Sequence, residues 1–180
     1  MGRPRFRRAL LLGVLLWSCW GLLAVAHAET QAISAIVSGA NIQKVGFRAM
    51  IQKLAIAYNL AGWVRNNPDG TVALSFQGDK ARIARAFEAI RAGSKRSSSA
   101  NTIRQSPGEL DPALSTFTIF GWTSATRNIT TPYDLVFTLR SSNDEITHKS
   151  AKKIWNAIAL ATLKGSDLAK FQKHLDERDD

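Results

Sequence analysis

Two short stretches of the sequence carry side chains that suit phosphate chemistry. In residues 38–48 a β-prone run ends in a polar loop, and the loop leads directly into a helical pattern. The first N–H groups of a helix have no partner within the helix, and together with the helix dipole they favour an anion. Arg48 falls in the first turn, where its guanidinium can bind two phosphate oxygens at once. Taken alone, this stretch is explained more simply by an exposed arginine without a ligand.

The second stretch, residues 62–70, joins a predicted strand to a strong turn sequence. Asn66 lies where the strand meets the turn, and its carboxamide can accept a hydrogen bond from a water molecule and donate one to it. Asparagine is also common in turns because its side chain bonds the turn backbone. Each stretch is therefore weak evidence by itself.

The spacing of apolar residues predicts a fold with helices and strands around these two stretches. Apolar residues at every third or fourth position indicate helices, and alternation indicates half-buried strands. The predicted elements are strand 33–38, helix 46–58, strands 60–65 and 71–77, a helix between Asp79 and Gly93, a weak strand 100–105 and strand 115–120. This is the order of a ferredoxin-like βαββαβ sandwich of the α/β (α+β) class, with one short additional strand. In that fold two helices cover one face of an antiparallel sheet.

The chain divides into three predicted segments. An arginine-rich start, the apolar residues 9–26 and the sequence Ala-His-Ala at 26–28 are typical of a signal peptide. An uncleaved membrane anchor through residues 9–26 is the alternative. We therefore expect an exported protein of the periplasm or cell envelope, with residues 32–120 as its main domain. Residues 121–180 form a C-terminal extension of unknown role, predicted as strand 133–140, helix 150–163 and a last helix capped by Ser166.

Composition limits the chemistry that the exported part can perform. Cys19 is the only cysteine and lies inside the apolar stretch, so cleavage would leave no disulfide and no thiolate nucleophile. His148 and His174 are too few and too far apart in sequence to suggest a metal site. Cleavage would also remove four arginines and no acidic residue, which lowers the net charge from +10 to +6. A solvated basic surface explains that charge more simply than nucleic-acid binding, because the aromatic residues alternate as core positions do.

Taken together, the two stretches resemble the acylphosphatase family. The sequences Val-Gly-Phe-Arg at 45–48 and Gly-Trp-Val-Arg-Asn at 62–66 match the family's two motifs almost letter for letter. Gly78 and the sequence Phe-Thr-Ile at 117–119 fall where the family has a glycine and its final strand. The resemblance covers about half of the chain, and two motifs at the correct separation make it fairly specific.

The resemblance implies a small hydrolase of the carboxyl–phosphate bond that uses neither metal nor cofactor. It implies that Arg48 holds the phosphate together with N–H groups of the loop, and that Asn66 positions the attacking water. The loop residues implied are Ile42, Gln43, Lys44, Val45, Gly46 and Phe47. No strong protein base is required if the substrate phosphate takes the proton, so positioning and charge stabilisation do most of the work.

The loop departs from the family pattern, because it has one residue more and Lys44 stands where the family has a glycine. If that position needs a positive φ, a lysine costs about 1–2 kcal/mol there, while its charge favours an anion. The alternative to an active enzyme is therefore a catalytically weak or inactive anion-binding module in the cell envelope. As partners we expect a small acyl phosphate or another phosphate-bearing ligand and no nucleic acid, with the chain a monomer.

Overall fold

The computed structural model describes residues 29–94, 96 and 102–179. The predicted export segment, residues 1–28, therefore lies outside the described part of the chain, and export stays a prediction. No helix within the described ranges is long and apolar enough to cross a membrane. The strands are β1 (Thr30–Ser38), β2 (Ala61–Asn66), β3 (Val72–Asp79), β4 (Thr102–Pro107), β5 (Thr116–Ser124) and β6 (Ile129–Thr138). The helices are α1 (Phe47–Tyr58), α2 (Lys80–Ala92), the short 3-10 helix η1 (Ala125–Arg127), α3 (His148–Thr162) and α4 (Gly165–Asp179).

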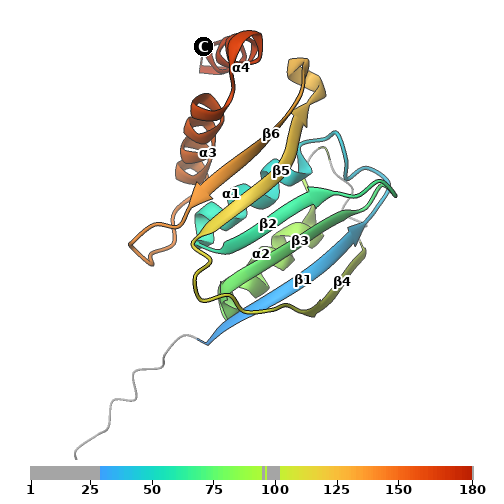
Figure 1. Ribbon diagram of the computed structural model, residues 1–180, viewed down its shortest axis with the longest axis vertical. Coiled ribbons are helices and arrows are strands. Elements are labelled where there is room, and N and C mark those ends of the chain that lie inside the picture. Colours follow the sequence, from blue (N-terminus) through green and yellow to red (C-terminus); the bar gives the residue numbers. More distant parts are fainter. Residues whose placement is uncertain (1–28, 95, 97–101, 180) are drawn as a thin grey trace, which may run out of the picture.

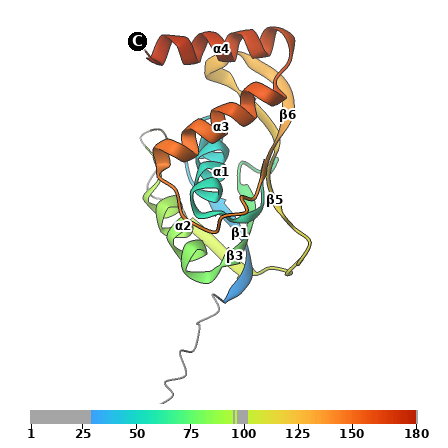
Figure 2. The same cartoon turned by 90° about the vertical axis from the view of Figure 1, so that its left-hand side faces the viewer.

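The strands form one sheet in the order β4-β1-β3-β2-β5-β6 (Figure 1). The pairs β4–β1, β1–β3 and β3–β2 are antiparallel, and β5 lies parallel to β2. Helices α1 and α2 lie together on one face of this sheet (Figure 2). The first four strands and two helices confirm the predicted ferredoxin-like fold, and β5 extends the same sheet beside β2.

The core forms between the sheet and the helices because each element carries one apolar face. Phe76 of β3 lies at its centre, with its ring 5.5 Å from those of Phe87 on α2 and Phe117 on β5. Asp79 caps α2 as predicted, since its side chain accepts a hydrogen bond from the Arg82 N–H at 2.9 Å. These contacts pack α2, β3 and β5 together in one core.

The C-terminal extension continues the same sheet. Strand β5 runs past residue 120 to Ser124, so the expected boundary at residue 120 falls inside a strand, and β6 returns antiparallel beside it. Strand β6 begins at Ile129, earlier than the predicted strand 133–140. Ser166 lies inside α4 and does not cap it, because the left-handed turn that starts this helix is made by Gly165 (φ 53°).

Helices α3 and α4 are held by aromatic packing at the far end of β5. Trp122 of β5, Trp155 of α3 and Phe171 of α4 form a cluster with ring centroids 5.8 to 6.5 Å apart, and all three are buried. Tyr133 of β6 also donates a hydrogen bond to Asp167 of α4 at 2.9 Å. Figure 2 shows α3 on the same side of the sheet as α1, with α4 beyond the tip of the β5–β6 hairpin.

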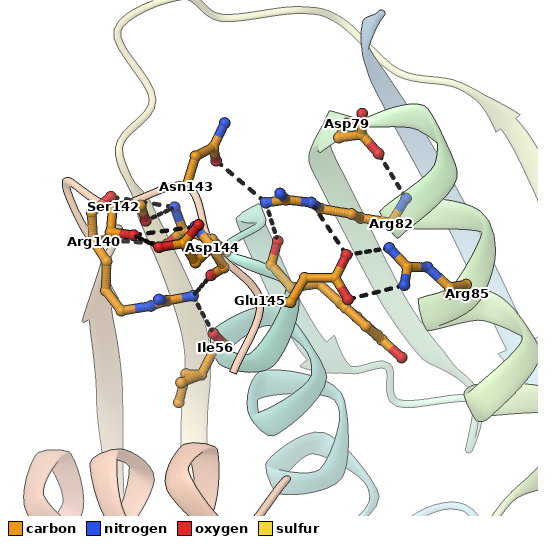
Figure 3. A network of polar contacts seen from close by, with 11 residues as sticks. Ile56, Asp79, Arg82, Arg85, Arg140, Ser142, Asn143, Asp144 and Glu145 are labelled. Atoms are coloured by element: carbon orange, nitrogen blue, oxygen red, sulfur yellow. Dashed lines mark hydrogen bonds and ion pairs between the residues drawn. The ribbon is translucent and has the colours of Figure 1, made fainter. Parts of the chain in front are cut away.

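The loop between β6 and α3 fastens the extension to α1 and α2 (Figure 3). Glu145 forms ion pairs with both Arg82 and Arg85 of α2. Arg140 donates to the Ile56 carbonyl at the end of α1, and the Ile146 N–H donates to the carbonyl of Ala57. Because the loop bonds both helices, residues 121–179 belong to the same packed unit as the sheet.

Candidate functional site

A pocket of about 800 Å³ lies at the N-terminus of α1. Its walls come from the loop before α1, α1 itself, the end of β2, the end of α2, and the extension, which supplies residues 122–127, 129 and 130 and two residues of α3. The predicted site residues that line it are Ile42, Lys44, Val45, Gly46, Phe47, Arg48 and Asn66. The fold thus brings the two predicted side chains, Arg48 and Asn66, to one cavity although they lie on different elements.

The start of α1 is open towards this pocket. Gly46 is the N-cap residue in a left-handed conformation (φ 82°), and no side chain caps the helix. The first turn closes with a bond from the Met50 N–H to the Gly46 carbonyl at 3.0 Å, so the N–H groups of residues 47–49 precede the first intrahelical bond. A helix start without a cap presents these donors and the positive end of the helix dipole to an anion.

Arg48 is held in place by the backbone of β5. Its Nη1 donates to the carbonyls of Phe120 at 2.7 Å and Gly121 at 2.9 Å. Within the described part of the chain these are its hydrogen bonds, so Nε and Nη2 remain available to a ligand. Burial lowers the pKa of Arg48, but an arginine stays a cation at neutral pH. The contact thus orients a fixed positive charge.

A bulge in β5 supplies these two carbonyls. The register of β5 with β6 shifts between Ile119 and Trp122, and Gly121 takes a positive φ of 58° there. The Gly121 N–H donates to Asp134 Oδ1 on β6 at 2.8 Å. Asp134 therefore fixes the bulge that orients Arg48. No motif in the sequence marks Asp134, although a glycine between two aromatic residues of a strand is a signal for a bulge.

Asn66, at the end of β2, lines the same pocket. Its Oδ1 is buried and has no hydrogen-bond partner among the described residues. The turn that follows is held instead by Asn67, whose side chain donates to Thr71 Oγ1 at 3.0 Å. A buried polar atom without a protein partner is normally satisfied by water. Asn67, and not Asn66, therefore has the turn-stabilising role that asparagines often have.

Gln43 has a different place from the rest of the predicted loop. Its side chain does not line the pocket, but donates to the carbonyls of Asn67 at 3.0 Å and Thr71 at 2.9 Å. Ile42 beside it is buried in the core. Gln43 thus ties the loop before α1 to the β2–β3 turn, and it fixes the distance between the two halves of the site.

Lys44 takes the backbone conformation that glycine favours. Its φ is 61°, in the left-handed region, and its side chain is exposed at the edge of the pocket. The strain of a non-glycine residue there is about 1–2 kcal/mol. The lysine therefore destabilises the loop while it adds a cation next to the helix start.

The pocket has the donors of an anion site and not of a metal site. No group of three or more His, Cys, Asp or Glu residues that could hold a metal ion occurs in ranges 29–94 and 102–179. What converges on the pocket is a set of helix N–H groups, an oriented guanidinium and an amide suited to a water molecule. Such a set can bind a phosphate group and hold a nucleophile beside it.

Comparisons with known proteins show which family the first part of the described chain resembles. A family model described as acylphosphatase matches residues 33–119. The chain is 43% identical over 84 residues to the acylphosphatase of Chlorobaculum tepidum, an alignment that covers 47% of this chain and 89% of that protein. It is 41% identical over 61 residues to the acylphosphatase of Geobacillus kaustophilus, which covers 34% of this chain and 64% of that protein.

Two solved structures are similar to part of the chain. The acylphosphatase of Coxiella burnetii is 26% identical with a TM-score of 0.45, and the match covers 50% of this chain and 92% of that one. The acylphosphatase of Bacillus subtilis is 29% identical with a TM-score of 0.42, and the match covers 49% of this chain and 97% of that one. The family match ends at residue 119, so most of the extension lies outside it.

Replacing Lys44 should change stability and anion binding in opposite directions. We expect Lys44→Gly to raise the free energy of unfolding by about 0.5–1 kcal/mol, because relief of the positive φ exceeds the added chain entropy of glycine. Loss of the charge should weaken the binding of inorganic phosphate about threefold. Urea denaturation and calorimetry measure the two effects. Lys44→Ala is the control, since it removes the charge but keeps the strain. Equal stability of the two variants would contradict this account of the loop.

Replacing Asp134 tests whether the bulge positions Arg48. Asp134→Ala should weaken phosphate binding by up to about tenfold, because the Gly121 N–H loses its partner and the two carbonyls lose their fixed position. Asp134→Asn keeps an acceptor oxygen and should restore most of the affinity. If the alanine and asparagine variants bind phosphate equally, the carboxylate acts through its charge or not at all, and the positioning role is wrong.

Proposed function

This chain belongs to the acylphosphatase family and is a hydrolase, and we propose that it cleaves the carboxyl–phosphate bond of acyl phosphates to yield a carboxylate and phosphate. One observation carries the proposal: an oriented guanidinium and an unsatisfied carboxamide line the same pocket at an uncapped helix start. A phosphate bound by the first group would lie beside a water held by the second.

Phosphate binding in this proposal uses two kinds of donor. Nε and Nη2 of Arg48 bind phosphate oxygens while Nη1 stays on the β5 carbonyls. Backbone N–H groups at the start of α1 bind further phosphate oxygens, and the positive end of the helix dipole stabilises the negative charge of the phosphate. Because these donors are fixed before the substrate arrives, they need little reorganisation as charge develops on the phosphoryl group.

The attacking water in this proposal is held by Asn66. The water oxygen attacks phosphorus, the bond from phosphorus to the acyl oxygen breaks, and the electron pair leaves with the carboxylate. The proton of the water passes to a phosphate oxygen, so the step needs no protein base. A carboxylate is a good leaving group at neutral pH, so the step needs no general acid either. Positioning and electrostatic stabilisation are the contributions left to the protein.

The strained loop supports a second reading. Lys44 holds a left-handed conformation that glycine would adopt without strain, and an altered loop could bind phosphate without the geometry for turnover. The second candidate function is therefore an anion-binding module that has lost hydrolysis. Purified protein that binds phosphate but does not hydrolyse benzoyl phosphate would support this candidate over the first.

Substitution of the two proposed catalytic residues tests the first candidate. We expect the protein to hydrolyse benzoyl phosphate, and Arg48→Gln and Asn66→Ala each to lower kcat/KM by about 100-fold or more, since each removes a group that acts on the transition state. Arg48→Lys should restore only part of the loss, because an ammonium lacks the planar fork. Arg65→Gln and Asn143→Ala are matched controls on exposed residues outside the pocket. Undiminished hydrolysis by Arg48→Gln would refute the proposed role of this arginine.

A further inference from the structure

The extension supplies one whole wall of the pocket. The lining residues that come from the extension are residues 122–127, Ile129, Thr130, His148 and Trp155. All of these residues lie beyond residue 119, where the family match ends. At about 800 Å³ the pocket is in the range that encloses a drug-sized ligand, and is larger than a phosphate with a two-carbon acyl group needs. The residues of the extension therefore enclose additional space in the pocket, beyond the proposed phosphate site at the start of α1.

The lining of the pocket is positively charged. The cations that line the pocket are Lys44, Arg48, Lys53, Arg96 and Arg127, while its described lining residues contain no Asp or Glu. A cavity lined by charges of one sign focuses the field and concentrates ligands of the opposite sign. A single phosphate at the start of α1 would occupy only one part of this cluster, because Arg127 belongs to η1 and Lys53 lies further along α1.

Two of these cations are held by aromatic rings that belong to the extension. The Arg127 guanidinium lies 5.0 Å from the ring centre of Phe171, and its Nη1 donates to Ser124 Oγ at 3.3 Å. Lys53 of α1 has its Nζ 4.4 Å from the ring centre of Trp155. Contacts of this kind restrict long side chains, so less entropy is lost when they bind a ligand. Both positive groups are therefore placed before any ligand binds.

We propose that the extension builds a second anion subsite, and that this subsite selects acyl phosphates whose acyl group itself carries a negative charge, such as a carboxylate. Arg127 and Lys53 bind the second anion, while the phosphate lies at the start of α1. The inference rests on the proposed function for the location of the phosphate. The acyl chain crosses the pocket between the two sites.

A pair of stable analogues tests the subsite without turnover. Benzoylphosphonate has a carbon–phosphorus bond in place of the labile oxygen bridge, and 4-carboxybenzoylphosphonate differs from it by one added carboxylate. Calorimetry should show that the carboxylated analogue binds about tenfold more tightly, as expected for a charge-assisted hydrogen bond. The preference should shrink as salt concentration rises. Equal affinity of the two analogues would overturn the proposal.

Variants on the two walls identify the residues that recognise the added carboxylate. Arg127→Gln should reduce the preference for the carboxylated analogue to about twofold or less. Lys53→Gln should also reduce this preference. The second variant is needed because Arg127 packs on Phe171, so its loss could also disturb α4. Arg65→Gln is the matched control, because this arginine also lies over an aromatic ring, 5.2 Å from the centre of Trp63, but outside the pocket. A preference unchanged in both pocket variants would overturn the assignment.

Turnover of the corresponding phosphates separates this inference from the proposed function. If the protein hydrolyses benzoyl phosphate and 4-carboxybenzoyl phosphate with equal kcat/KM, the hydrolase proposal stands and the subsite is refuted. If it prefers the carboxylated phosphonate in binding but hydrolyses neither phosphate, the subsite stands and the hydrolase proposal fails.

Discussion

The left-handed turn at Gly46 is the constraint on which the site depends. It starts α1 without a capping side chain, so that the first N–H groups of the helix stay open towards the pocket. Without a ligand these N–H groups would lack a hydrogen-bond acceptor wherever they are buried. An anion bound at the helix start would accept hydrogen bonds from them. Arg48 follows two residues later and adds a charge whose direction is set by the β5 carbonyls. The geometry of one helix start is therefore the basis of the proposed phosphate site.

The C-terminal extension forms part of the pocket at the start of α1. Strand β6 holds the Gly121 bulge through Asp134, and the bulge orients Arg48. The loop from β6 to α3 is bonded to α1 and α2, so the wall that the extension forms is rigid relative to the helix start (Figure 3). A chain that ended after β5 would lose the Asp134 contact and the lining residues that follow Ser124. The same residues thus stabilise the fold and enlarge the pocket.

The sequence predicts the local features of this protein well and its long-range contacts poorly. Helix starts, caps and turns depend on neighbouring residues, which is why the cap of Asp79 and the element order could be read in advance. The roles of Gln43 and Asp134 depend on partners in other strands and turns, and no spacing rule reveals such pairs. The motifs predicted that Arg48 and Asn66 work together, and the fold places both at one pocket, but neither motif showed that Arg48 bonds β5. The extension carried no motif, so its contribution to the pocket could come only from the packed structure.

The most direct test of the central claim is a titration of the protein with inorganic phosphate followed by nuclear magnetic resonance of its amide groups. We expect the backbone N–H signals of residues 44–49 and the side-chain amide of Asn66 to shift together along one saturating binding curve. Signals from β4, at the opposite edge of the sheet, should stay in place. Saturable shifts elsewhere, with the signals of residues 44–49 unmoved, would contradict the claim that the open start of α1 is the phosphate site.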